Sequence, residues 1–187
     1  MTQAALSRRS ALAALVALPC SSWAQASAIP AEVASELAAS RLHGAGRLTW
    51  FGLSVYDVRL WAGERFSAAQ FEREPLALEI QYARTLHGKQ IAERSLTEMQ
   101  RFGATSEADA ARWLASMIQL FPDVAAGDRL TGVHRPGEAA RFYFNGKLRG
   151  EVREADFARR FFGIWLSPQT SEPKLRLALL GGSRAGS

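Results

Sequence analysis

The longest stretch with a strand-like pattern of apolar and polar positions runs from Gly46 to Trp61, GRLTWFGLSVYDVRLW. Strand side chains alternate between two faces, so one face should meet a core through Leu48, Trp50, Tyr56, Val58 and Leu60. The other face is polar at its ends and apolar in its middle, at Phe51, Leu53 and Val55. We therefore predict one long strand whose centre is covered on both sides.

Two small residues, Gly52 and Ser54, lie between the large aromatic side chains of this predicted strand. A glycine inside a strand often marks the close approach of another segment. Two interpretations follow, a tightly packed helix or a bound ligand, and the helix is the commoner reason.

The next clear strand is Leu76 to Tyr82, in which apolar side chains alternate with the residues between them. If the alternation continues, Arg84 lies on the core face, where it needs a carboxylate or a ligand anion because an unpaired buried charge is very costly. If the strand ends first, Arg84 is solvated. The sequence leaves both alternatives open.

Helical periodicity predicts a helix from Lys89 to Phe102, which Gly103 ends. Ser106 and Asp109 have the spacing of a capping box, so they predict the start of a second helix that ends before Pro122.

The last third of the chain reads as short strands followed by helices. The predicted strands are 130–134, 139–144 and 147–152, and the pair Asn145-Gly146 predicts a tight hairpin turn because both residues tolerate positive φ. Helices are expected at 156–165 and 173–180.

Near the N-terminus of the expected domain, residues 27–41 fit either a short helix or a first strand, and the glycines of 43–46 predict a turn. Together these elements indicate one α+β domain.

The first residues have the features of an export signal. Arg8 and Arg9 precede an apolar run, and Ala24-Gln25-Ala26 has the small residues of a cleavage site. We expect residues 1–26 to be removed and residues 27–187 to form one domain in the periplasm or outside the cell. An ordinary secretory leader fits better than a twin-arginine signal. The apolar run is too short to span a bilayer, so no membrane span is predicted.

Composition removes several function classes. The one cysteine, Cys20, lies in the predicted leader, so the mature chain should lack disulfides, thiolate metal sites and cysteine nucleophiles. The net charge of +5 is small and the arginines are scattered, which does not indicate a nucleic-acid partner. His43, His87 and His134 are far apart and are expected at surfaces or turns. No cofactor or metal site is predicted.

Several segments, in order, resemble the exported bacterial branch of the chalcone-isomerase-like superfamily. They are WFGLSVYDVRLW, HGKQIAERSLTEM, FPDVAAGDRLTG, NGKLRGEV and FARRFFGIWLSP. The resemblance covers about residues 42–181. It implies a large antiparallel β-sheet with helices packed on one face, and an apolar ligand cleft between the two layers.

The resemblance also implies where the polar groups of plant chalcone isomerase would fall. Its threonine falls on Phe51, its lysine on Tyr82, its helix tyrosine on Ile91, its asparagine near Glu98 and its late threonine on Arg160. Its arginine falls near Ala39, with Arg41 within a small alignment error. Phe51 and Ile91 cannot donate hydrogen bonds, and one lost oxyanion donor raises the barrier by roughly 3 to 4 kcal/mol.

We therefore predict a non-catalytic periplasmic protein that binds an apolar small molecule, fatty-acid-like or related, in the cleft between sheet and helices, with an anionic group on the ligand as one alternative. Relatives in the superfamily hold a fatty-acid carboxylate with an arginine and a tyrosine, so the candidate ligand-binding residues are Arg41, Arg47, Tyr56, Tyr82 and Arg84. Two alternatives stay open: an isomerase of the chalcone-isomerase type, and an interaction module whose cleft its own side chains fill. The sequence does not give the oligomeric state.

Overall fold

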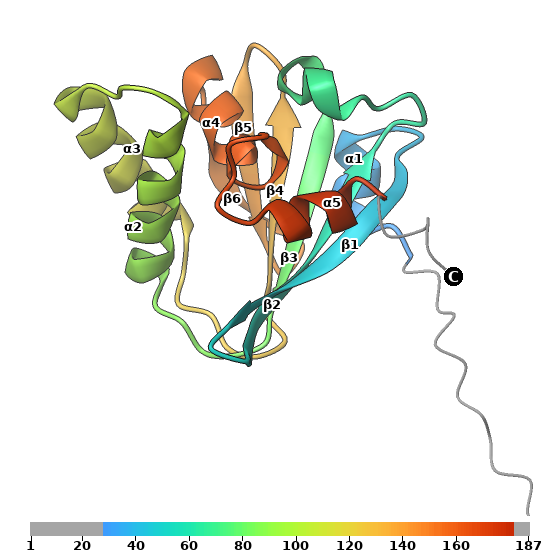
Figure 1. Cartoon of the computed structure of the whole chain (residues 1–187), viewed down its shortest axis with the longest axis horizontal. Coiled ribbons are helices and arrows are strands. Elements are labelled where there is room, and N and C mark those ends of the chain that lie inside the picture. Colours follow the sequence, from blue (N-terminus) through green and yellow to red (C-terminus); the bar gives the residue numbers. More distant parts are fainter. Residues whose placement is uncertain (1–27, 182–187) are drawn as a thin grey trace, which may run out of the picture.

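A computed structural model of the chain describes residues 28–181, and its centre is an antiparallel sheet in which every strand pairs with the strands before and after it (Figure 1). The strands are β1 (Arg41–Trp50), β2 (Leu53–Ala62), β3 (Leu76–Tyr82), β4 (Arg129–Arg135), β5 (Ala139–Phe144) and β6 (Lys147–Val152). The helices are α1 (Ala31–Glu36), α2 (Gly88–Met99), α3 (Glu107–Leu120), α4 (Ala155–Leu166) and α5 (Pro173–Leu179), with 3-10 turns at Ala68–Arg73 and Gln100–Phe102. The expected α+β fold with a large antiparallel sheet is confirmed.

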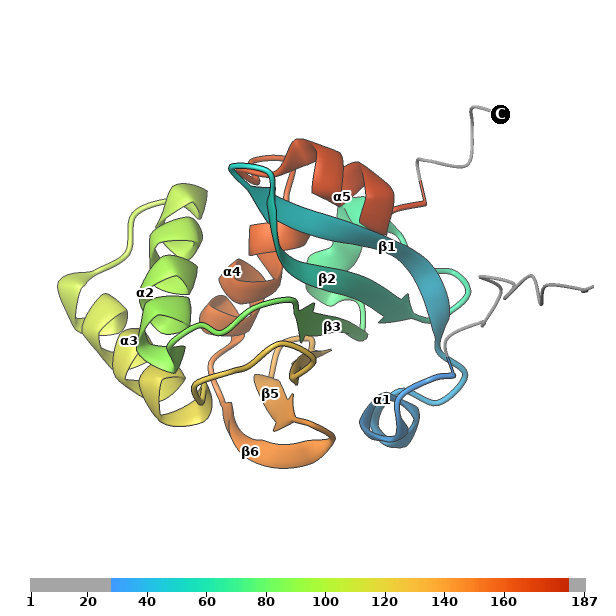
Figure 2. The same ribbon diagram turned by 90° about the horizontal axis from the view of Figure 1, so that it is seen from below.

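Helices cover both faces of the sheet rather than one. The main core lies between the sheet and helices α2 to α5, and it includes Leu78 of β3, Phe142 of β5 and Phe161 of α4. On the opposite face, α1 packs through Val33 against a smaller apolar cluster, and Figure 2 shows α1 on the side of the sheet away from α4. The expectation of helices on one face is therefore corrected for α1.

Carboxylates of α1 explain why this segment is a helix on the second face. Glu32 accepts a hydrogen bond from Arg129 at 2.8 Å, and Glu36 accepts one from Arg141 at 2.8 Å and another from Tyr143. Burial alone would raise the pKa of the Glu36 carboxyl, but these hydrogen bonds hold its pKa below the usual value. The sheet thus supplies partners that decide between the two alternatives for residues 27–41.

The predicted single strand from Gly46 to Trp61 is wrong, because the chain reverses in its middle and forms the β1–β2 hairpin. Phe51 has φ of 48° and Gly52 has φ of 78°, the two consecutive positive values of a tight hairpin turn. A Cβ on Gly52 would meet nothing within 4 Å, so a close helix does not explain this glycine, whereas its positive φ does. Leu48 and Tyr56 pair across the hairpin and still share the core side.

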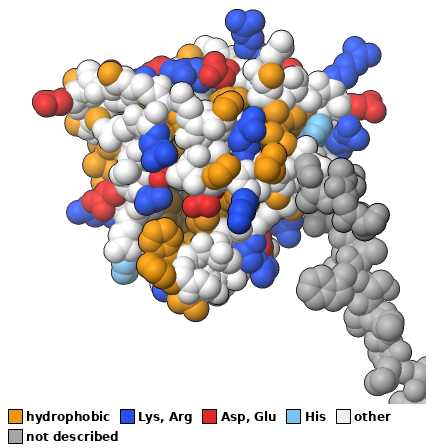
Figure 3. Space-filling model, viewed as in Figure 1, with side chains coloured by type: hydrophobic (Ala, Val, Ile, Leu, Met, Phe, Trp, Pro, Cys, Tyr) orange, Lys and Arg blue, Asp and Glu red, His pale blue; other side chains and the backbone are white. Residues whose placement is uncertain are grey.

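The hairpin turn carries apolar side chains into solvent, contrary to the expected coverage on both sides. Phe51 is 90% exposed and Trp50 is 57% exposed, and Leu53 is also exposed. Apolar side chains gather at this lower end of the molecule in Figure 3. The predicted core face is correct for Leu48, Tyr56 and the strand residues beyond, and it is wrong for Trp50.

The glycines of residues 43–46 lie inside β1 and do not form the predicted turn. A Cβ on Gly44 would lie 2.3 Å from the backbone oxygen of Ala178, and one on Gly46 would lie 2.5 Å from Cδ1 of Leu175. Neither position has room for a side chain, because α5 lies directly on β1. Their glycines therefore serve close packing between two segments far apart in the sequence.

Other local predictions are confirmed. Strand β3 has the predicted bounds, and Asn145 and Gly146 have φ of 48° and 80° in the β5–β6 turn. Ser106 caps α3, since its Oγ accepts a hydrogen bond from the Asp109 backbone N–H at 3.0 Å. His134 is an exception: it is 1% exposed, and its Nδ1 lies 3.0 Å from the Glu74 carbonyl oxygen, so it is a core residue.

The predicted leader and Cys20 lie outside the described residues. Within residues 28–181 no helix has the length and apolar character needed to cross a membrane.

Candidate functional site

A pocket of about 260 Å³ lies between the sheet and helices α2 and α4. Its wall is mostly apolar and includes Leu48, Ile80, Ile91, Phe161, Ile164 and Trp165. Ile80 and Tyr82 of β3 are two residues apart, and Ile91, Ser95 and Glu98 of α2 are about one turn apart, so β3 and α2 each present one face to the pocket. The cleft that the sequence resemblance implied between sheet and helices is therefore present.

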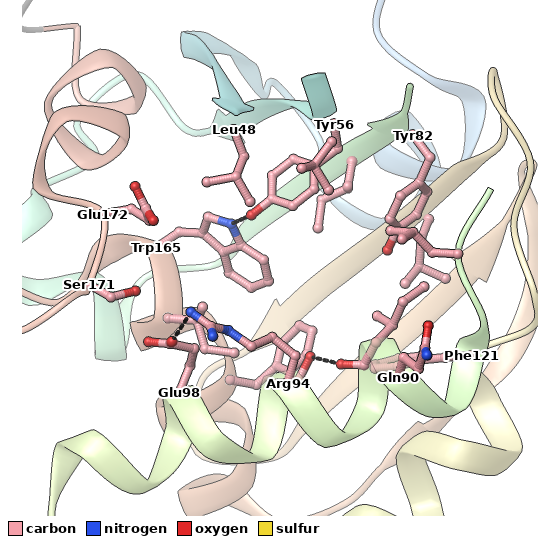
Figure 4. A pocket seen from close by; sticks show the side chains of 18 residues that line it. Leu48, Tyr56, Tyr82, Gln90, Arg94, Glu98, Phe121, Trp165, Ser171 and Glu172 are labelled. Atoms are coloured by element: carbon pink, nitrogen blue, oxygen red, sulfur yellow. Dashed lines mark hydrogen bonds and ion pairs between the residues drawn. The ribbon is translucent and has the colours of Figure 1, made fainter. Parts of the chain in front are cut away.

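Polar side chains lie at the rim of this pocket, where α2 meets the segment before α5 (Figure 4). Arg94 is exposed, and its guanidinium lies 2.6 Å from Oε1 of Glu98, whose side chain is only 7% exposed. Arg101 approaches the other oxygen of Glu98 at 3.6 Å. Glu172 lines the rim as well. The rim thus has two carboxylates beside one guanidinium that is already paired.

Two tyrosines line the wall of the pocket on the sheet side. Tyr56 of β2 and Tyr82 of β3 lie opposite each other in register, and their ring centroids are 6.1 Å apart. Trp165 Nε1 donates a hydrogen bond to the Tyr56 hydroxyl oxygen at 3.0 Å. Among the described residues the Tyr82 hydroxyl has no hydrogen-bond partner, and Figure 4 shows this hydroxyl pointing into the pocket.

Both phenols are protonated at neutral pH, and burial raises each pKa further above it. Loss of solvent raises the pKa of Tyr56 to about 12, although the hydrogen bond from Trp165 acts against this rise. Burial also raises the pKa of Tyr82, and the neighbouring Tyr56 adds to the rise. Both hydroxyls therefore keep their hydrogen at neutral pH and are available as hydrogen-bond donors.

The structure brings together two of the five candidate ligand-binding residues, Tyr56 and Tyr82, in this pocket. The other three, Arg41, Arg47 and Arg84, do not line it. Arg41 donates a hydrogen bond to the Glu64 carbonyl oxygen at 3.2 Å, on the surface.

Arg47 and Arg84 lie outside the pocket for different reasons. Arg47 lies opposite Asp57 across the hairpin and pairs with its two carboxylate oxygens at 2.6 and 3.0 Å. Arg84 comes after the end of β3 and is exposed. Because the strand ends at Tyr82, its alternation does not reach Arg84, and the solvated alternative is the one observed.

Sequence reasoning did not single out Arg94, the one arginine among the residues that line the pocket. Arg94 and Glu98 are one helical turn apart, the spacing of an exposed ion pair on any helix, so nothing local distinguishes them. The available signal was the row of Ile91, Ser95 and Glu98 on α2, which faces the core beside Arg94.

Some of the positions matched to the catalytic groups of chalcone isomerase line the pocket, and others lie outside it. Tyr82, Ile91 and Glu98 line the pocket, whereas Phe51 lies at the exposed hairpin turn. Arg160 lies in α4, and it donates to the Gly103 carbonyl at 2.9 Å and to Asp156 at 2.8 Å, outside the pocket lining. Within residues 28–181 no three histidine or acidic side chains are placed to hold a metal ion.

Comparison with known proteins gives three findings. A sequence profile described as chalcone isomerase-like matches residues 24–181. An uncharacterized protein of Haemophilus influenzae is 28% identical over 142 residues, which cover 76% of this chain and 68% of that protein. The structure resembles that of a fatty-acid binding protein of Arabidopsis thaliana, with a TM-score of 0.61 and 14% identity over 78% of this chain and 89% of the other.

Proposed function

This chain belongs to the chalcone isomerase-like family, and from that premise we propose that it binds an apolar small molecule without transforming it. The observation that supports this most directly is the pocket itself, an open cavity with mostly apolar walls beside the main core. Protein interiors leave few voids larger than a water molecule, so a cavity of this size suggests a ligand. The open volume favours this proposal over an interaction module with a self-filled cleft.

The pocket volume suits a ligand of moderate length. About 260 Å³ corresponds to roughly nine water molecules of the liquid, and a methylene group takes up about as much space. We propose an acyl chain or a similar apolar body on the order of eight to ten carbons long. The name of the Arabidopsis structural neighbour supports a fatty-acid-like body, although the similarity to that protein shows the fold alone.

The chemistry of the pocket favours binding over catalysis. Its one lining arginine, Arg94, is paired with Glu98, and burial makes Tyr56 and Tyr82 weaker acids. Ile91 offers no hydrogen bond where the isomerase has a tyrosine. Incubation with a chalcone, followed by its absorbance, tests this proposal. We expect no ring closure above the uncatalysed rate, and catalysed closure would restore the isomerase alternative.

Filling the pocket should weaken binding without damaging the fold. Ile91→Trp places a larger side chain in the wall of the cavity, so we expect the affinity for a neutral apolar fluorophore to fall at least roughly tenfold. Fluorescence titration measures this change. Ile118→Trp is the matched control, because Ile118 is exposed on α3 and does not line the pocket. Equal affinities of both variants and wild type would place the ligand elsewhere.

We also propose that the protein works in the periplasm or outside the cell, from the predicted export signal in residues 1–26. N-terminal sequencing of exported protein should find Ser27 first. Material that retains Cys20, or that carries a lipid there, would contradict this proposal.

A further inference from the structure

We infer that the pocket selects a ligand with an uncharged oxygen acceptor, such as a ketone or ester carbonyl, which the hydroxyl of Tyr82 holds by a hydrogen bond. This inference rests on the proposed function and specifies the class of ligand for the same pocket. It differs from the expectation of a carboxylate held by an arginine.

The hydroxyl of Tyr82 carries the inference. The residue is 4% exposed, and no described protein group makes a hydrogen bond with its hydroxyl, which faces the pocket (Figure 4). A phenylalanine would provide the same packing, and the Tyr82 hydroxyl makes no hydrogen bond within residues 28–181 that would be lost with it. The hydroxyl therefore adds little to folding, and a ligand that expels water from the pocket must supply its partner.

Tyr56 provides a second donor beside the first. Its oxygen already accepts the hydrogen bond from Trp165 Nε1 at 3.0 Å, which fixes the phenol and leaves the hydroxyl hydrogen for another acceptor. Tyr56 and Tyr82 are neighbours in register on β2 and β3. The sheet side of the pocket thus offers a second donor to a ligand, apart from the Tyr82 hydroxyl.

The charges around the pocket disfavour an anion. Arg94 is the one cationic side chain that lines it, and Glu98 already neutralises Arg94 at 2.6 Å. Glu98 and Glu172 are both lining carboxylates. A carboxylate ligand beside the tyrosines would be buried with no unpaired cation among the lining residues, whereas a carbonyl avoids this cost.

Two ligands of similar length test the inference by calorimetric titration at neutral pH: methyl hexyl ketone, which is neutral, and octanoate, which is charged. Wild type should bind the ketone more tightly. Tyr82→Phe should weaken ketone binding by roughly fivefold to tenfold, the usual effect of losing one hydrogen bond. Its melting temperature should stay within about one degree of wild type, because no hydrogen bond within the protein is lost.

Tyr143→Phe is the matched control, since Tyr143 lies on the opposite face of the sheet and bonds to Glu36. It should lower the melting temperature and leave ketone affinity unchanged. Tighter binding of octanoate, lost in Arg94→Gln, would overturn the inference but keep the proposed function. Absence of binding of the ketone, of octanoate and of the apolar fluorophore would overturn both. A marked loss of stability in Tyr82→Phe would assign its hydroxyl to folding.

Discussion

Gly44→Ala is expected to lower the free energy of unfolding by about 3 kcal/mol, the upper end of the range for overpacking. The new Cβ would lie 2.3 Å from the Ala178 oxygen and 2.4 Å from the Leu179 oxygen. Both atoms belong to the backbone of α5, so no side chain can rotate away. Either β1 or α5 must move, and the contact between them is lost. Urea unfolding followed by circular dichroism measures the change.

Gly63→Ala is the control for this prediction, because it adds the same methyl group just after β2 where nothing lies within 4 Å. We expect it to change the free energy of unfolding by less than about 0.5 kcal/mol. Equal stability of the two variants would show that α5 does not lie against β1 as described.

Phe142→Ala is expected to cost about 3 to 5 kcal/mol of stability. Phe142 of β5 is fully buried, and its ring lies 5.1 Å from the ring of Phe121 and 5.0 Å from that of Phe161. Phe121 directly follows α3 and Phe161 belongs to α4, so the substitution leaves a cavity where β5, α4 and the C-terminal end of α3 meet. A domain has only about 5 to 15 kcal/mol of stability in total, so the variant should be close to unfolding.

The same substitution at Phe51 provides the comparison, because Phe51 is exposed at the β1–β2 turn. Phe51→Ala should change the free energy of unfolding by less than about 0.5 kcal/mol. The same denaturation experiment measures both variants. If Phe142→Ala were as mild as Phe51→Ala, the aromatic core would not hold helices and sheet together.

Local chemistry made some elements predictable. The Asn145-Gly146 turn and the Ser106 cap each depend on a few adjacent residues, whose conformational preferences the surrounding fold does not overrule. The β1–β2 hairpin was missed because Phe51 occupies a turn position that usually has asparagine, aspartate or glycine. With an apolar residue at that position, the sequence pattern of the two strands is continuous and predicts a single strand.

Other features depend on segments far apart in the chain. Gly44 has the appearance of a turn residue until α5, more than a hundred residues later, is placed on it. The residues of the pocket were likewise only partly predictable from the sequence. Alternation along the strands placed Tyr56 and Tyr82 on the core face. Only the assembled fold shows that Arg94 lines the pocket and that Glu98 already forms an ion pair with Arg94.

The most direct test of a ligand-binding pocket is to identify what the protein carries when it is isolated. Protein purified without denaturation is extracted with organic solvent, and mass spectrometry compares wild type with Ile91→Trp. The account predicts an apolar molecule with an uncharged oxygen in the wild-type extract, in an amount that approaches one per chain and falls in the variant. Extracts of the same composition from both proteins would contradict it.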